Sequence, residues 1–256
     1  MERSVVRRTA TLAVAALACA GCQLVLGIDT NVPIVDGGPT PCTSQNAILC
    51  DDFEEGAIDN TRWQQVEQIS ATVTVDSIHA HWGSWALHAT TDAVVQTGGA
   101  NPGGYVDNER TQPFPQDFFV RFFLYVPSPS VAPTESQVII DAVDGSGVGM
   151  QLTSVVGNLG FTDWAATPQV NLRSATVLQP DTWHCIEWEV TQGQPQGHMN
   201  VWVDETQVSD LDVPVTTPAF SVLKLGIGFY QPPVQPAYDV WIDDVRVDTS
   251  RIHCSS

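Results

Sequence analysis

The sequence predicts an all-β protein in which two antiparallel sheets pack as a sandwich. Short segments rich in Val, Thr, Trp and Phe are broken by Gly, Pro and Asn at short intervals, as in strands joined by turns. Apolar and polar residues alternate in several of these segments, which is the pattern of a strand with one buried face. Helical periodicity is hard to find outside the first residues, and about 235 further residues suit one domain of this class.

In chain order, strands are expected wherever such alternation runs between turn residues. Phe118–Val126 is the strongest, and the aromatic side chains on both of its faces predict a central strand with one face lining a groove. The other strands expected before residue 180 are Ile48–Glu54, Ala71–Val75, the end of residues 81–89 after a Gly-containing turn, Gln137–Val143, Met150–Val155 and Leu159–Trp164.

The last third of the chain predicts two further pairs of strands. Thr182–Val190 and Gly197–Leu211 have the pattern of a hairpin with a turn at Asp204 and Glu205. Residues 222–230 alternate Leu, Ile and Phe with polar residues and glycines, and residues 240–247 form a closing strand. We expect these last two strands to be a pair joined by a proline-rich loop, with the rest of the sheet built around them.

The first residues indicate export. Arg3, Arg7 and Arg8 precede an apolar run over residues 10–18 that is too short to span a bilayer as a mature helix. Small residues then lead to Cys22, and this ending resembles a bacterial lipoprotein signal. We therefore expect residues 1–21 to be a signal peptide and Cys22 to carry lipid, which would anchor the protein in the cell envelope, at the outer membrane or in the periplasm. An ordinary secreted protein cleaved nearby is the alternative.

Residues 22–41 are expected to be a tether and residues 42–256 the domain. Removing residues 1–21 takes away three arginines and one glutamate, which changes the net charge from −19 to about −21. So acidic a chain does not bind nucleic acid or anionic lipid through a general electrostatic field. No nucleic-acid partner is therefore expected, and the membrane is expected as a partner through the lipid anchor.

Four cysteines remain in the expected domain, and an even number in an exported chain favours two disulfides. Cys42 with Cys50 would close a short loop before the first strand. Cys185 with Cys254 would then tie an interior strand to the C-terminal tail, and we favour this pairing. Cys50 with Cys254 is a rival, because first and last strands are often neighbours in a sandwich.

Four short motifs resemble the concanavalin A-like superfamily, especially its laminin-G-like domains. In order, they are Cys50-Asp51-Asp52-Phe53-Glu54, Gly83-Ser84-x-Ala86-Leu87, Trp183-x-Cys185-x-Glu187 leading to Val201-Trp202-Val203-Asp204, and Ile242-Asp243-Asp244-Val245-Arg246-Val247. They span nearly the whole expected domain, and their order carries the resemblance. It implies a two-sheet antiparallel jelly-roll β-sandwich whose concave face often holds glycan.

Within that superfamily the chain is also similar to polysaccharide lyases of the alginate-lyase type. Their groove strand carries Lys-x-Gly-x-Tyr-x-Gln with the tyrosine as acid and base, and here Lys224, Gly226 and Tyr230 follow that order with extra sequence before the tyrosine. The resemblance implies β-elimination, which needs a group that neutralises a uronate carboxylate, a base and an acid. Gln137 stands where Gln-x-His is expected, without the histidine, and Arg121 is the candidate groove arginine.

Because that histidine is missing, we predict glycan or surface-ligand binding without catalysis and without an organic cofactor. One alternative is a polysaccharide lyase with Tyr230 as acid/base, and another is a structural or protein-interaction module. Glu187 and Glu189 are two residues apart, so we interpret them as surface charges and not as a glycosidase pair. The residues predicted to bind glycan on the concave face are Arg121, Tyr125, Gln137, Lys224 and Tyr230.

The resemblance also implies a structural calcium ion. In similar jelly rolls it lies between acidic residues of the first strand, a carbonyl of the Gly-Ser turn and an acidic residue of the last strand. Carboxylate and carbonyl oxygens are the ligands that this hard cation prefers. The corresponding residues are Asp52, Glu54, Gly83 and Asp243. An acidic surface patch without an ion is the alternative.

Overall fold

The computed structural model describes Cys42 and residues 47–95, 101–128, 137–155, 157–193, 197–230, 232 and 234–255. The predicted signal peptide, Cys22 and the tether lie outside the described residues. All described residues belong to one compact unit, Gly37–Ser256. Within them the one helical element is a single 3-10 turn, η1 (Ser209–Leu211), and no helix is long and apolar enough to cross a membrane.

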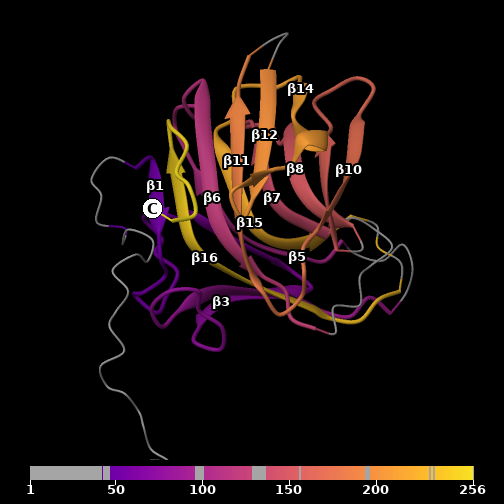
Figure 1. Ribbon diagram of the computed structural model, residues 1–256. Coiled ribbons are helices and arrows are strands. Elements are labelled where there is room, and N and C mark those ends of the chain that lie inside the picture. The colour runs from indigo at the N-terminus through magenta and orange to yellow at the C-terminus, as the bar shows by residue number, and fades with distance from the viewer. Residues whose placement is uncertain are drawn as a thin grey trace, which may run out of the picture. The chain divides into compact units, whose positions relative to one another are not determined.

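The strands form two antiparallel sheets packed as layers, so the predicted jelly-roll β-sandwich is confirmed (Figure 1). The larger sheet has nine strands and forms one layer of the sandwich. Its order is β13 (Thr206–Gln207), β12 (Gly197–Val203), β11 (Trp183–Thr191), β6 (Asp117–Tyr125), β16 (Tyr238–Asp248), β4 (Ala86–Thr91) and β3 (Ala71–Asp76), with β1 (Leu49–Asp51) beside β16 and β14 (Val213–Val215) beside β12.

The second sheet has seven strands and no branches. Its order is β10 (Val170–Val177), β9 (Asn158–Asp163), β8 (Gly149–Val155), β7 (Gln137–Val143), β15 (Val222–Phe229), β5 (Gly103–Glu109) and β2 (Gln65–Ile69). Three of these strands, β2, β5 and β10, were not expected from the sequence. The side chains of β2 and β10 are mostly exposed, and β5 begins with two glycines, so none of them shows a clear apolar alternation.

The strongest predicted features are confirmed in the nine-stranded sheet. The long strand β6 lies between β11 and β16, so it is a central strand. Strands β11 and β12 pair as the predicted hairpin partners, with Glu187 opposite Trp202. The predicted turn at Asp204 and Glu205 joins β12 to β13. These two residues have φ values of 49° and 66°, as in the two-residue turns that suit right-twisted strands.

The expected pairing of the two closing strands is wrong. Strand β15 lies in the seven-stranded sheet between β7 and β5, whereas β16 lies in the nine-stranded sheet between β6 and β4. The connection between them therefore crosses from one layer to the other. Local alternation shows that each segment is a strand, but it carries no information about which sheet the strand joins.

The hydrophobic core fills the space between the two sheets. Phe122 and Leu124 of β6 meet it from one side, and Leu223, Leu225 and Ile227 of β15 meet it from the other. Because successive side chains of a strand point to opposite faces, the polar residues between these positions face away from the core. On β15 this places Lys224 on the outer face of the seven-stranded sheet.

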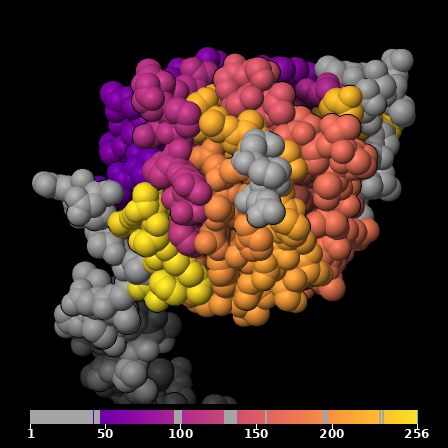
Figure 2. Space-filling view, turned by 90° about the horizontal axis from the view of Figure 1, so that it is seen from above, coloured from indigo at the N-terminus to yellow at the C-terminus, as the bar shows by residue number. Residues whose placement is uncertain are grey.

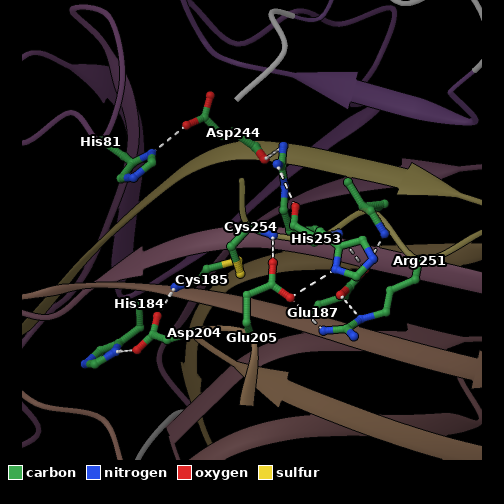
Figure 3. The surroundings of a disulfide bond; sticks show 12 residues. His81, His184, Cys185, Glu187, Asp204, Glu205, Asp244, Arg251, His253 and Cys254 are labelled. Carbon is green, nitrogen blue, oxygen red and sulfur yellow. Dashed lines mark hydrogen bonds and ion pairs between the residues drawn. A yellow bond between two sulfur atoms is a disulfide. The ribbon is translucent and has the colours of Figure 1, made fainter. Parts of the chain in front are cut away.

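The structure forms the disulfides Cys42–Cys50 and Cys185–Cys254, which is the connectivity that the sequence favours. The second one attaches the C-terminal segment to β11, and this segment lies at the surface beside the strands of the nine-stranded sheet (Figure 2). Figure 3 shows that Glu187 lies beneath it, where it accepts hydrogen bonds from Arg251 Nε (2.8 Å) and from the His253 backbone N–H (3.3 Å). Glu187 is completely buried, so its interpretation as a surface charge is wrong.

Candidate ligand-binding groove

The structure does not bring the five residues predicted to bind glycan onto one surface. Arg121 and Tyr125 are on β6 in the nine-stranded sheet, whereas Lys224 is on β15 and Gln137 on β7 in the seven-stranded sheet. Tyr230 follows directly after β15 and is 69% exposed. The outer faces of the two packed sheets point in opposite directions, so Arg121 and Tyr125 cannot contact a ligand that Lys224 contacts.

Arg121 holds the C-terminal segment in place. Its guanidinium donates hydrogen bonds to the backbone carbonyl of Asp244 (3.2 Å) and to that of His253 (3.4 Å). It also lies over the ring of Phe123, at 5.5 Å from the centroid. Burial lowers the pKa of Arg121, and the side chain is only 2% exposed, so it has a structural role in this fold.

Tyr125 belongs to an aromatic layer on the outer face of the nine-stranded sheet. Its ring stacks on His79 at 4.3 Å and lies 5.4 Å from the ring of Trp183. His79 also contacts the ring of Trp241 edge-on at 4.5 Å. The loop between β3 and β4 therefore covers this face with its own side chains.

Gln137 faces the core side of its sheet because β7 is irregular. It pairs with Phe229, which belongs to the core, while its neighbour Val138 pairs with Gly228 on the outer face. The register between β15 and β7 shifts between these pairs and the pair of Lys224 with Asp141. A one-residue shift of this kind moves a side chain to the opposite face of the sheet.

A row of polar residues crosses the outer face of the seven-stranded sheet, one from each strand. Each member pairs with the next across neighbouring strands, so their side chains lie side by side on the same face. In sheet order from β2 to β10 the row is Gln65, Asp107, Lys224, Asp141, Gln151, Thr162 and Asn171. Lys224 is the residue of this row that the sequence singled out.

Two acidic residues hold the ammonium group of Lys224. It forms an ion pair with Asp107 Oδ2 at 3.0 Å and a short hydrogen bond with Glu67. Burial opposes the charged form, but the hydrogen bonds to Glu67 and Asp107 outweigh it and raise the pKa of Lys224. Burial likewise raises the pKa of Asp107 to about 6 against the effect of Lys224. The charge of Lys224 is therefore neutralised within the protein.

Tyr105 lies across the centre of the same face. A Cβ atom at Gly228 would be 1.7 Å from its hydroxyl oxygen, so only glycine leaves room for the ring over β15. Burial raises the pKa of Tyr105 well above its usual value, and the carboxylates of Asp141, Glu67 and Asp107 raise it further. Tyr105 is therefore a neutral hydroxyl group at neutral pH.

A groove of about 510 Å³ opens beside this centre. Its position on the outer face of the seven-stranded sheet follows from its lining, which includes Asp141, Gln151, Thr162 and Asn171 of the polar row. The other lining residues are Val138, Trp164, Gln169 and Tyr230. The groove thus combines two aromatic rings with carboxylate, amide and hydroxyl groups.

Neighbouring groups hold the polar lining in place. Asn171 Oδ1 accepts a hydrogen bond from Thr162 Oγ1 at 3.0 Å and another from Gln169 Nε2 at 3.2 Å. The indole N–H of Trp164 donates to the carbonyl of Gly147 at 3.1 Å. The lining is therefore preorganised, which lowers the entropy cost of binding a ligand.

Asp141 differs from Asn171 and Trp164 in this lining. No hydrogen bond or ion pair joins either of its carboxylate oxygens to another residue in the described part of the chain, and Oδ1 is buried. Burial raises the pKa of Asp141 to about 7, although the nearby Lys224 acts in the opposite direction. A buried carboxylate oxygen without a hydrogen-bond donor is costly, and this one belongs to a residue that borders the groove.

We expect Asp141→Asn to stabilise the protein at high pH and not at low pH. The pKa of Asp141 is higher in the folded state than its unfolded value of about 3.9, so the wild-type protein loses stability as the pH rises from about 4 to about 7. After allowing for solvent screening in the open groove, we expect the variant to gain about 1–2 kcal/mol at pH 8. Urea unfolding at pH 4, 6 and 8 measures this difference, and an equal change at all three values would contradict it.

Two of the residues expected to hold calcium, Glu54 and Asp243, contact the loop that contains Gly83. Glu54 Oε1 accepts hydrogen bonds from the N–H groups of Ser84 (2.8 Å) and Trp85 (2.9 Å). Asp243 is buried and accepts from the N–H of His81 (2.8 Å), and burial raises its pKa to about 8. Backbone donors thus occupy these carboxylates, and Asp52, Glu54 and Asp243 do not gather their oxygens as a three-residue ligand set in the described chain. Calcium stays a prediction that rests on the resemblance.

One acidic cluster does gather in the described residues, and an arginine pairs with two of its members. Carboxylate oxygens of Asp51, Asp52 and Glu55 lie within 4.8 Å of one another. The guanidinium of Arg62 lies 2.9 Å from Asp51 and 3.0 Å from Glu55. Arg62 therefore compensates one of the three carboxylates.

The sequence reasoning missed Tyr105, Asp107, Asp141 and Trp164 as site residues. Each is a single polar or aromatic residue in a strand or turn and matches no motif. A usable signal was the alternation of residues 137–143, which separates Asp141 from the apolar set Val138, Ile140 and Ala142. The neighbours that give Asp141 its importance come from strands far away in the sequence.

Comparisons with known proteins identify the fold. No protein-family model matches the chain, and no curated protein matches it. Among solved structures it is similar to an endo-β-1,4-glucuronan lyase from the fungus Trichoderma reesei, with a TM-score of 0.64 and 16% identity over 80% of this chain and 96% of that chain. It is also similar to a cellulose induced protein, Cip1, with a TM-score of 0.63 and 16% identity over 80% of this chain and 99% of that chain. At these identities the matches show the fold, a jelly-roll sandwich of the kind that the resemblance to the concanavalin A-like superfamily implies.

Proposed function

We propose that the protein binds a polysaccharide in the groove on the outer face of the seven-stranded sheet and does not cleave it. The observation that carries this proposal is the groove lining itself. Trp164 and Tyr230 offer flat aromatic surfaces for the apolar faces of sugar rings, and the amide and hydroxyl groups of Gln151, Thr162 and Asn171 can hydrogen-bond to sugar hydroxyls.

Two structural neighbours give independent support for a carbohydrate ligand. One is a lyase that acts on glucuronan, and the other is named for its induction by cellulose. Each match covers 80% of this chain. Because the identities are 16%, this support concerns the class of ligand and not the chemistry performed on it.

The charges of the groove argue against β-elimination. A polyuronate lyase needs a positive group that neutralises the substrate carboxylate. Lys224 is already paired with Glu67 and Asp107, and Arg121 lies on the other sheet. A uronate carboxylate near Asp141 would therefore meet negative charge without a compensating cation from these residues.

Hydrolysis by a pair of carboxylic acids is also disfavoured. That mechanism needs two carboxyl groups facing the same glycosidic bond. Among the described residues Asp141 is the one acidic residue that lines the groove, and Asp107 is 1% exposed and paired with Lys224. A single free carboxyl group suits binding better than hydrolysis.

Affinity electrophoresis tests this proposal. The mature protein is run through native gels that contain different polysaccharides, together with Trp164→Ala and the control Trp82→Ala. We expect one polymer to retard the wild-type protein, and Trp164→Ala to lower the affinity about tenfold or more. Trp82 is 43% exposed but does not line the groove, so its variant should behave as wild type. A cleared track behind the band would indicate cleavage, and unchanged mobility in every gel would contradict glycan binding.

We also propose that the protein is exported and carries lipid on Cys22. The two disulfides support an oxidising compartment, where such bonds persist. Mass spectrometry of the mature N-terminus tests the modification, with Cys22→Ser as the variant that should stay unmodified. An unmodified wild-type N-terminus would leave secretion without an anchor.

A further inference from the structure

The centre of the seven-stranded sheet has more negative than positive charge. Glu67, Asp107 and Asp141 surround Lys224, which is the sole lysine of the chain. Lys224 compensates one of these three carboxylates when all are ionised, and two negative charges remain. The net charge of −19 for the whole chain reinforces this local excess.

Asp141 is the part of this excess that a ligand in the groove can reach. It lines the groove, and neither of its oxygens has a donor in the described part of the chain. On the Lys224 side, Asp107 is 1% exposed, and its Oδ1 also lacks a hydrogen-bond partner. On the other side, Asp141 pairs across the strands with Gln151, whose amide can orient a polar ligand.

No positively charged group of the described residues donates a hydrogen bond to Asp141. We propose that the groove prefers a glycan with free amino groups, and that the ammonium of an amino sugar binds over Asp141. This inference rests on the proposed glycan-binding function and specifies its ligand class. An ammonium group supplies both the hydrogen bonds and the charge that Asp141 needs, and such charge-assisted bonds are stronger than neutral ones.

A divalent cation fits this place less well than an ammonium group. Among the described residues, the carboxylates of Glu67, Asp107 and Asp141 do not form a set whose oxygens all lie within 4.8 Å of one another. Lys224 also occupies the space between Asp107 and Asp141 in the cross-strand row. An organic cation on a sugar ring needs only Asp141 and can place its ring against Trp164 or Tyr230.

Titration calorimetry with soluble oligosaccharides of equal length tests the inference. The four probes are a β-1,4-glucosamine oligomer, its N-acetylated form, a cello-oligosaccharide and a β-1,4-glucuronate oligomer. We expect the wild-type protein to bind the glucosamine oligomer about tenfold more tightly than its N-acetylated form, and the glucuronate oligomer most weakly. Asp141→Asn should remove this preference, so that the glucosamine oligomer and its N-acetylated form bind the variant with similar affinity.

Asp117→Asn is the matched control, because it removes the same charge from an exposed position on β6 in the other sheet. It should keep the preference, which separates local recognition from attraction to an acidic protein. A wild-type protein without the preference, or an Asp141→Asn variant that retains it, would overturn the inference while leaving glycan binding intact. Failure to bind any of the four oligomers, together with unchanged mobility in the polysaccharide gels, would instead contradict the proposed function.

Discussion

Replacing both Cys185 and Cys254 with alanine is expected to lower the free energy of unfolding by about 4 kcal/mol. The two cysteines are 69 residues apart, and closing a loop of that length restricts the unfolded chain by roughly this amount. In the folded state the bond also keeps the C-terminal segment over Glu187, which is buried beneath it. Urea unfolding of the oxidised wild-type protein and the double variant gives the difference.

The other disulfide is the control for this prediction. Cys42 and Cys50 are only eight residues apart, so the same loop argument gives about 2.5 kcal/mol for their double alanine variant. The order of the two effects is the sharper test. A larger loss from the Cys42/Cys50 variant would show that chain entropy does not dominate the contribution of these bonds.

Replacing Asp51 with alanine is expected to destabilise the protein by about 3–4 kcal/mol. Its carboxylate is 1% exposed and accepts hydrogen bonds from the indole N–H of Trp63 (2.6 Å), from the N–H of Phe53 (3.0 Å) and from Arg62 (2.9 Å). Truncation would leave the buried indole donor and the guanidinium without this acceptor, and such groups are costly when unpaired. Thermal and urea unfolding measure the loss.

Glu55→Ala is the control for Asp51→Ala, because Glu55 pairs with the same arginine. The distance from Arg62 Nη1 to Glu55 Oε1 is 3.0 Å, and the side chain of Glu55 is 51% exposed. Pairs of this kind contribute about 0–1 kcal/mol. Similar losses for the two variants would mean that burial of Asp51 does not determine its effect.

The sequence predicts strands well where apolar alternation is long. The nine-residue strand β6 and the β11–β12 hairpin are such cases, because their buried faces repeat at every second residue. It fails for β2, whose five residues are mostly exposed and polar. A strand at the edge of a sheet needs no apolar stripe when its neighbour already covers the core.

The candidate site was harder to predict, because it depends on which strands are neighbours. Arg121 and Lys224 both sit in convincing strands, but the strands belong to different sheets. Asp107, Asp141 and Lys224 are far apart in the sequence, and only the pairing of β5, β15 and β7 places them in one row. Alternation within one strand cannot reveal this row.

Gln137 shows how one extra residue changes a prediction. It is four residues before Asp141, so both side chains would share a face in a regular strand. The irregular pairing of β7 turns Gln137 toward the core, where it lies opposite Phe229, and leaves Asp141 in the groove. The sequence around Gln137 does not reveal this irregularity. Because Gln137 faces the core, its predicted role in binding is wrong.

The most direct test of the account asks which sheet a bound glycan covers. Hydrogen exchange measured by mass spectrometry, with and without the oligosaccharide that binds best, answers this for the whole chain. We predict slower exchange in the segments that line the groove, residues 149–155 and 158–171, and unchanged exchange in β6 and β11 of the nine-stranded sheet. Protection centred on β6, β11 and the loop that carries His79 would contradict the account and place the glycan on the aromatic layer of the opposite face.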